Sequence, residues 1–155
     1  MTLQSTVNDK QAFGNVGAFY DDSPRRVAPY VLDAACPVGN ACTLVAASEG
    51  HATVGGSGVF GGILVNGHEY VKDGLGASLS VPAGTNVQLC TMGHVVVKVT
   101  TAASVGYVAA FNDTTGAIEA YAAAGSVASG STLIPNAKFV FVSAAQNGLA
   151  VLELT

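Results

Sequence analysis

The chain has 155 residues, of which half are hydrophobic and only 10% are charged. This length fits one domain, because most domains contain roughly 100–150 residues. The net charge of −4 argues against a nucleic-acid partner, since nucleic acids select basic surfaces. The uncharged stretches are interrupted by Gly, Pro and amide side chains, so none predicts a membrane-spanning helix of about 20 apolar residues.

Residues 1–26 differ in composition from the rest of the chain. Isolated aromatic side chains alternate with polar ones, and Gly14, Gly17 and Pro24 interrupt any helix. This pattern predicts an extended N-terminal arm that binds another protein, because a few aromatic and arginine side chains often dominate an interface. The candidate contact residues are Phe13, Phe19, Tyr20, Asp21, Asp22, Arg25 and Arg26.

Two questions about the arm stay open from the sequence. The same residues also fit an N-terminal strand that folds back on its own barrel. If the arm does bind outside its own barrel, removing residues 2–20 leaves the barrel folded. The neighbouring acidic and basic pairs, Asp21–Asp22 and Arg25–Arg26, are expected to form ion pairs within the arm or with a partner, or to remain solvated.

Short apolar stretches separated by turn signals follow the arm. We expect strands at 27–33, 42–47, 60–65, 86–91, 95–100, 107–111, 117–121, 137–143 and 149–154, a helical turn at 68–72, and loops at 34–40, 49–58 and 122–130. Gly61 and Gly62 should bend the strand in which they lie, and Gly93 should end one. Many short strands without an amphipathic helix predict an all-β fold, a single small β-barrel or sandwich over residues 27–155.

The strongest local signal is a hairpin between residues 106 and 121. Two apolar stretches flank the segment Asn112-Asp113-Thr114-Thr115-Gly116. Asn and Asp start turns by accepting hydrogen bonds from the backbone that follows, and Gly supplies a positive φ. The segment therefore predicts a tight reversal between two strands.

The histidines and cysteines do not form a recognisable metal or catalytic motif. His51, His68 and His94 lack the paired spacing of metal-binding histidines. The cysteines are Cys36, Cys42 and Cys90, an odd number for a disulfide framework. Cys36 and Cys42 could pair, or bind a metal together with His51, but a fourth ligand is not evident, and buried inert thiols are favoured.

Other catalytic patterns are equally weak. Glu69 could face Glu119 or Asp113 as a glycosidase pair, but nothing in the sequence selects these carboxylates. The chain has no GxSxG motif, and the glycine-rich residues 55–58 lack the lysine of a phosphate-binding loop. We therefore expect neither an enzyme nor a cofactor.

The charged side chains are also sparse over the second half of the chain. From Gly74 to the end, the charged residues are Lys98, Asp113, Glu119, Lys138 and Glu153. A free monomer usually stays soluble through mixed surface charge, and an ordinary domain is roughly 25% charged. We therefore expect other protein to cover much of this surface, and the free protein to be a homo-oligomer.

Several motifs in this order resemble the structural cement, or capsid decoration, proteins of tailed bacteriophages. They are AFGNVGAFYDDSPRRVAPYVL in the arm, then GVFGGILVNGHEY, VPAGTNVQLCTMGHVVVKV, the D-x-TGAI hairpin at 113–118, IPNAKFV and GLAVLEL. The resemblance covers most of the chain, although the sparse charge of the second half departs from the family pattern.

The resemblance implies a non-enzymatic β-barrel on the outer face of the capsid shell. Such a protein ties neighbouring major capsid subunits together, often as a trimer, with a dimer as the alternative. The rival hypothesis is a virion-surface β-module that binds a carbohydrate or a receptor. That hypothesis is weaker because carbohydrate sites favour exposed aromatic side chains, whereas this chain has no Trp and only 7% aromatic residues.

Overall fold

The computed structural model describes residues 14–66, 80–141 and 143–155, and in these residues the protein is built from β-strands. The prediction of an all-β barrel fold is confirmed. The strands are β1 (Arg26–Leu32), β2 (Cys36–Pro37), β3 (Ala41–Leu44), β4 (His51–Val54), β5 (Phe60–Leu64), β6 (Ser80–Val81), β7 (Asn86–Lys98), β8 (Val108–Asn112), β9 (Ile118–Tyr121), β10 (Ser131–Val140) and β11 (Leu149–Leu154), with a 3-10 turn η2 (Ala124–Ser126) before β10.

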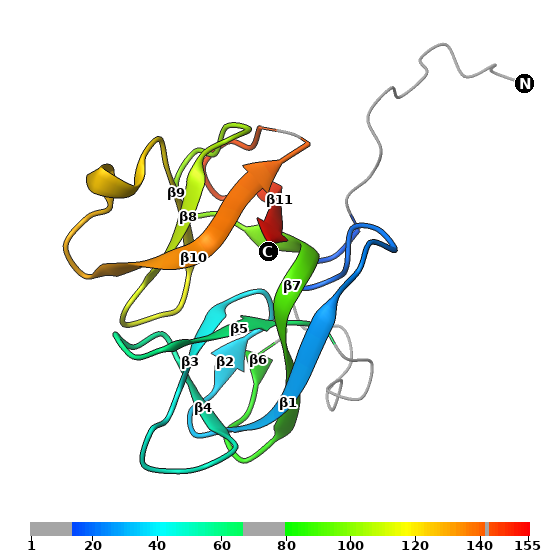
Figure 1. Cartoon of the computed structure of the whole chain (residues 1–155), viewed down its shortest axis with the longest axis vertical. Helices are drawn as coiled ribbons and strands as arrows, with labels where there is room; N and C mark the ends of the chain where they lie inside the picture. Colours follow the sequence, from blue (N-terminus) through cyan, green and yellow to red (C-terminus); the bar gives the residue numbers. More distant parts are fainter. Residues whose placement is uncertain (1–13, 67–79, 142) are drawn as a thin grey trace, which may run out of the picture.

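The strands form two groups that share the long strand β7, which runs between them in Figure 1. In the first group the order is β1-β4-β3-β5-β7, and β1 also pairs with β7, so this group closes into a barrel. In the second group the order is β7-β11-β10-β8-β9, and a parallel bridge from Val99 to Ile118 brings β9 back beside the end of β7. Closure removes the exposed strand edges that would otherwise invite aggregation.

Strand β7 continues through Gly93, where the sequence predicts a break. That prediction is wrong. Met92 pairs with Arg26 of β1, and Gly93 pairs with Leu154 of β11, so the strand changes partners at this residue. Gly93 has a φ of +127°. Only glycine adopts such a φ readily, so here it lets the strand turn from one group into the other instead of ending it.

Other predicted boundaries also need correction. The expected loop at 49–58 contains β4, and the expected loop at 34–40 contains the short strand β2, which pairs with β6. Strand β10 begins at Ser131, earlier than predicted, and ends at Val140. The predicted bend at the paired glycines is confirmed, because the β3–β5 register shifts where Cys42 pairs with Gly62 and Thr43 with Phe60. The expected helical turn at 68–72 lies outside the described residues.

The predicted hairpin reversal is confirmed, and it also joins the two strand groups. The Asn112 side-chain oxygen accepts hydrogen bonds from the N–H groups of Thr114 and Thr115, and Gly116 has a φ of +68°. The Ala41 N–H donates to the Gly116 carbonyl at 2.8 Å, and the Gly56 N–H donates to the Asp113 carbonyl at 2.6 Å. The turn of the second group therefore packs directly on β3 and the end of β4.

Each group has its own apolar core. In the first, the fully buried side chains include Leu32, Cys42, Leu64, Val87 and Leu89. In the second, they include Val95, Val97, Phe111, Phe139 and Leu152. Both sets contain residues of β7, so this strand supplies side chains to both cores.

The three thiols are free and fully buried. The Sγ atoms of Cys36 and Cys42 lie 3.6 Å apart and share a hydrogen bond. This bond, together with burial, raises the pKa of Cys42 well above its usual value. Burial also raises the pKa of Cys90. In the folded protein Cys42 and Cys90 are therefore weak nucleophiles, because the reactive species is the thiolate.

We expect the folded protein to react with a thiol-specific disulfide reagent at pH 8 only as fast as it unfolds, whereas the denatured chain reacts at once. The raised pKa values also predict a pH dependence. The folded state holds these protons more tightly, so their contribution to stability is full below the unfolded pKa of about 8.5 and falls as the pH rises above it. Rapid labelling of Cys42 or Cys90 in the folded protein, read by peptide mass spectrometry, would contradict this prediction.

Candidate functional site

The described part of the arm, residues 14–25, lies against the protein's own strands. Phe19 bridges to Val95 of β7, and its side chain packs on the second core. The N–H groups of Gly17 and Tyr20 donate to the carbonyls of Val96 and His94 at 2.7 and 2.9 Å. The segment thus continues along the edge of β7 on which β1 lies. Residues 17–20 fold back on the barrel, as one of the two interpretations of the sequence expects.

His94 joins the arm to β11 through polar contacts. Its Nδ1 lies 2.8 Å from the Asp21 carboxylate and 3.1 Å from the Ser23 hydroxyl, and its Nε2 lies 3.8 Å from Glu153. Lys138 of β10 approaches Glu153 on the other side, at 3.4 Å. The hydrogen bond from the Ser23 hydroxyl lowers the pKa of Asp21, and His94 adds to this effect. The carboxylate therefore stays ionised near neutral pH.

Aromatic side chains surround this polar group. Tyr20 stacks on Phe141 with ring centroids 4.9 Å apart, and His94 meets the same Phe141 ring edge-on at 5.2 Å. The guanidinium of Arg25 lies 4.4 Å from the centre of the Phe19 ring, a cation–π contact. We call the residues Phe19, Tyr20, Asp21, Arg25, His94, Phe141 and Glu153 the arm-base cluster.

The sequence identified four members of this cluster and missed three. Phe19, Tyr20, Asp21 and Arg25 come together as a group, whereas His94, Phe141 and Glu153 carry no local pattern that marks them. Within the described part of the arm, the aspartates do not form ion pairs with the arginines, and Asp21 contacts His94 instead.

The remaining predicted contact residues lie elsewhere. Asp22 and Arg26 are exposed, with Arg26 at the start of β1. Phe13 lies outside the described residues. Seven contact residues were predicted in the arm, and their binding to a partner stays a prediction.

A shallow pocket opens where the ladder between β8 and β10 is interrupted. Leu133 pairs with Ala110, but the next pair on these strands joins Lys138 to Val108. Pro135 has no N–H to contribute to the ladder, and the backbone of Asn136 is left-handed with a φ of +52°. The strands separate here around a pocket of about 360 Å³.

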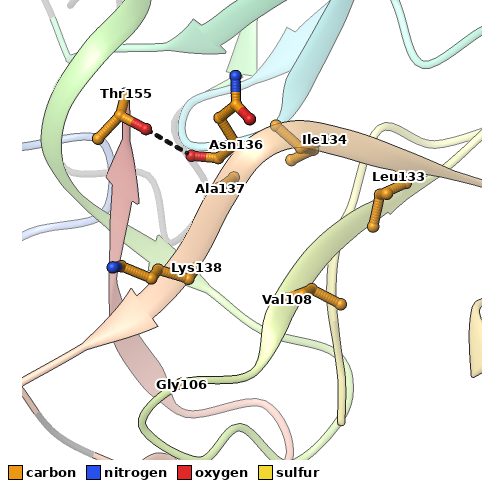
Figure 2. Close-up of a pocket in the computed structure, with 8 residues that line it drawn as sticks. All are labelled: Gly106, Val108, Leu133, Ile134, Asn136, Ala137, Lys138 and Thr155. Atoms are coloured by element: carbon orange, nitrogen blue, oxygen red, sulfur yellow. Dashed lines mark hydrogen bonds between the residues drawn. The ribbon is translucent and has the colours of Figure 1, made fainter. Parts of the chain in front are cut away.

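Figure 2 shows how the pocket is walled. Leu133 and Val108 lie on neighbouring strands on one side, and Asn136 and Thr155 lie on the other, joined by a hydrogen bond of 3.0 Å from the Thr155 hydroxyl to the Asn136 carbonyl. Ile134 and Ala137 add apolar atoms to the wall, and Lys138 also lines the pocket, with its ammonium group directed towards β11. The lining is mixed, with the polar groups of Asn136, Lys138 and Thr155 beside the apolar side chains.

Outside the arm-base cluster, the described residues bring few titratable side chains together. His51 and Asp33 form an exposed pair with 2.5 Å between Nδ1 and the carboxylate. No group of three or more His, Cys, Asp or Glu in these residues could hold a metal ion, and Glu69 and His68 lie outside them. Within the same residues, no helix is long and apolar enough to cross a membrane.

The family of structural cement proteins, described as "Structural cement protein (E217 gp24/Pam3 gp6)", matches residues 3–155, so the chain belongs to this family. The family membership gives the chain a structural role on the phage capsid, as a protein that decorates and stabilises the shell. The expectation from the sequence motifs is confirmed.

The fold is also known from a solved structure. A chain in the structure titled "The capsid of Myoviridae Phage XM1" superimposes with a TM-score of 0.67 at 14% sequence identity, and the match covers 100% of this chain and 98% of that one. At this identity the likeness shows the fold. None of the curated proteins searched matches the chain.

Proposed function

We propose that the protein binds the outer face of the capsid shell and ties neighbouring major capsid subunits together, with the arm as a principal contact. Membership of the cement family supports this role. The observation that supports the detail is the arm-base cluster, together with the hydrogen bonds that hold residues 17–20 on β7. An arm anchored in this way reaches a neighbouring subunit without losing its own attachment.

The predicted contact residues fit this arrangement. Arg25 and Tyr20 are residue types that often carry interface energy, and both belong to the described part of the arm, where Arg25 is exposed and Tyr20 is partly buried. Phe13 would extend the contact, since about 13 extended residues span roughly 40 Å. Asp22 and Arg26 are exposed. They would fix the position of the arm on the capsid more than the affinity of its binding, because exposed ion pairs contribute only about 0–1 kcal/mol.

The proposed assembly in solution is a homo-oligomer, a trimer in preference to a dimer. A ring of copies presents several arms at once, and linked contacts raise the apparent affinity without one tight site. Exposed apolar side chains on the described surface, among them Val59 at 71% and Phe141 at 52%, are consistent with coverage by other protein.

The test of the proposal is attachment to shells that lack the protein. Purified protein is mixed with such capsids and with fully decorated capsids as the control, and the bound fraction is measured by co-sedimentation. We expect saturable binding to the bare shells and little to the decorated ones. Replacing both Tyr20 and Arg25 by alanine should weaken binding at least tenfold. Equal binding of this variant would show that the arm base is not the contact.

A further inference from the structure

Two of the three thiols are in contact inside the first core. Cys36 of β2 and Cys42 of β3 are 0% exposed, and their Sγ atoms lie 3.6 Å apart. A disulfide joins two sulfurs at about 2.0 Å, so a shift of roughly 1.5 Å separates this contact from a covalent bond. Cys90 belongs to the second core, where its thiol donates to the Met92 carbonyl at 3.1 Å. Of the three pairs that these cysteines could form, the fold therefore brings one into contact.

The two cysteines enclose residues 37–41, a loop that touches both the arm and the second strand group. The Val38 side chain packs against the arm at Gly17, where an added Cβ would lie 2.1 Å from the Val38 Cγ1. The Asn40 side-chain amide donates to the Thr115 carbonyl in the hairpin turn at 2.9 Å. A covalent bond across this loop would therefore restrain the place where the arm and the two strand groups meet.

A phage capsid passes through two redox environments. In the cytosol of the host, glutathione and thioredoxin keep thiols reduced, whereas disulfides form and persist on virion surfaces and in other oxidising surroundings. Family membership gives this chain its place on the capsid. The protein is therefore exposed to oxidants, already folded, once the capsid has left the host cell.

We propose that Cys36 and Cys42 form a disulfide after the capsid leaves the reducing cytosol, and that this bond fixes the loop 37–41 beneath the arm. The oxidant is a low-molecular-weight disulfide. One protein thiolate attacks a sulfur of the oxidant, forms a mixed disulfide and releases one small thiol. The second thiolate then attacks the protein sulfur of the mixed disulfide and releases the other small thiol. The two protein thiols lose two protons and two electrons, which the two released thiols carry away.

Burial sets the rate of this exchange but not its end point. Because both thiols are buried, the first attack waits until the protein opens, in agreement with the slow labelling expected above. The same burial then shields the finished bond from reductants, since an attacking thiolate must reach one of the two sulfurs. The inference does not depend on which surface the protein uses to bind the shell.

The test compares the equilibrium for forming the disulfide in the folded and in the denatured protein. The protein is equilibrated with fixed ratios of reduced and oxidised glutathione, in buffer and in urea, and the folded state is reached both from folded protein and by refolding. Free thiols are trapped at each ratio, and mass spectrometry of unreduced peptides identifies the pairs. Cys90→Ser is the control that keeps the pair, and Cys36→Ser removes it. Should Cys36→Ser fail to fold, Cys42→Ala takes its place.

We expect the equilibrium constant for the bond between Cys36 and Cys42 to be about tenfold or more higher in the folded protein than in urea, because the fold already holds the two sulfurs in contact. By linkage, oxidation should lower the unfolding equilibrium constant by the same factor, in the wild type and in Cys90→Ser but not in Cys36→Ser. Three results would overturn the inference: an equal or smaller constant in the folded protein, a bond to Cys90, or a glutathione adduct as the final product. These measurements use the free protein, so their failure would leave the capsid role standing.

Discussion

Replacing Gly116 by alanine is expected to lower the free energy of unfolding by about 3 kcal/mol or more. The φ of Gly116 is +68°, and an added Cβ would lie 2.5 Å from the Ala41 carbonyl oxygen and 2.9 Å from a methyl group of Val54. A left-handed backbone costs a non-glycine residue roughly 1–2 kcal/mol, and overpacking adds roughly 1–3 kcal/mol. The turn would have to withdraw from β3, which would loosen the joint between the two strand groups.

Gly106→Ala is the matched control for this variant. Gly106 also has a positive φ, +90°, but nothing lies within 4 Å of its added Cβ. In this control the free energy of unfolding should therefore fall only by the cost of a left-handed backbone at alanine, about 1–2 kcal/mol. Urea unfolding of both variants measures the difference. Equal losses would show that the contact between the turn and β3 contributes little to stability.

Shortening the arm at two positions should produce two different defects. Removing residues 2–13 should leave the unfolding free energy nearly unchanged but weaken capsid attachment, because Phe13 and its neighbours would be lost. Removing residues 2–20 should also destabilise the fold by about 3 kcal/mol or more. That deletion takes away the burial of Phe19 and several backbone hydrogen bonds, each of which contributes about 1 kcal/mol. The pairing of residues 17–20 with β7 thus changes the expectation from the sequence that this deletion spares the barrel.

A urea titration and a capsid co-sedimentation assay on both truncated proteins separate these effects. The wild type with an added N-terminal tag of similar length serves as the control for changes at the terminus. If removing residues 2–13 already lowered the free energy of unfolding, the expectation that these residues contribute to attachment but not to folding would be wrong. If neither deletion altered attachment, the arm would not be a capsid contact.

Local sequence signals predicted much of the fold. The hairpin at Asn112–Gly116 is readable because its turn depends on side chains within a few residues of each other. The strand β11 is readable because an apolar run follows a clear turn at Asn147–Gly148. The continuation of β7 through Gly93 is not readable, since a glycine in a strand marks either a bend or an end. Whether the strand bends or ends here depends on pairing with distant segments. Met92 pairs with Arg26, and Gly93 pairs with Leu154.

The arm-base cluster shows the same limit. Phe19, Tyr20 and Arg25 stand out in the sequence because aromatic and basic side chains gather in one segment. Their partners are His94 of β7 and Phe141, the residue that follows β10, and neither carries a motif. Contacts between distant segments depend on how the sheet closes, and no local periodicity records that closure. The sequence therefore indicated the arm as a candidate surface but not the place where its base docks.

The role of the protein is most directly tested by the stability of the shell to which it binds. Capsids that lack the protein are heated with and without saturating amounts of it, and the temperature at which the shells come apart is followed by light scattering. A ligand that binds only the intact shell must raise this temperature as its concentration rises. We expect a rise of several degrees that saturates when the binding sites are full. An unchanged disruption temperature at full occupancy would contradict the conclusion that this protein is a capsid cement.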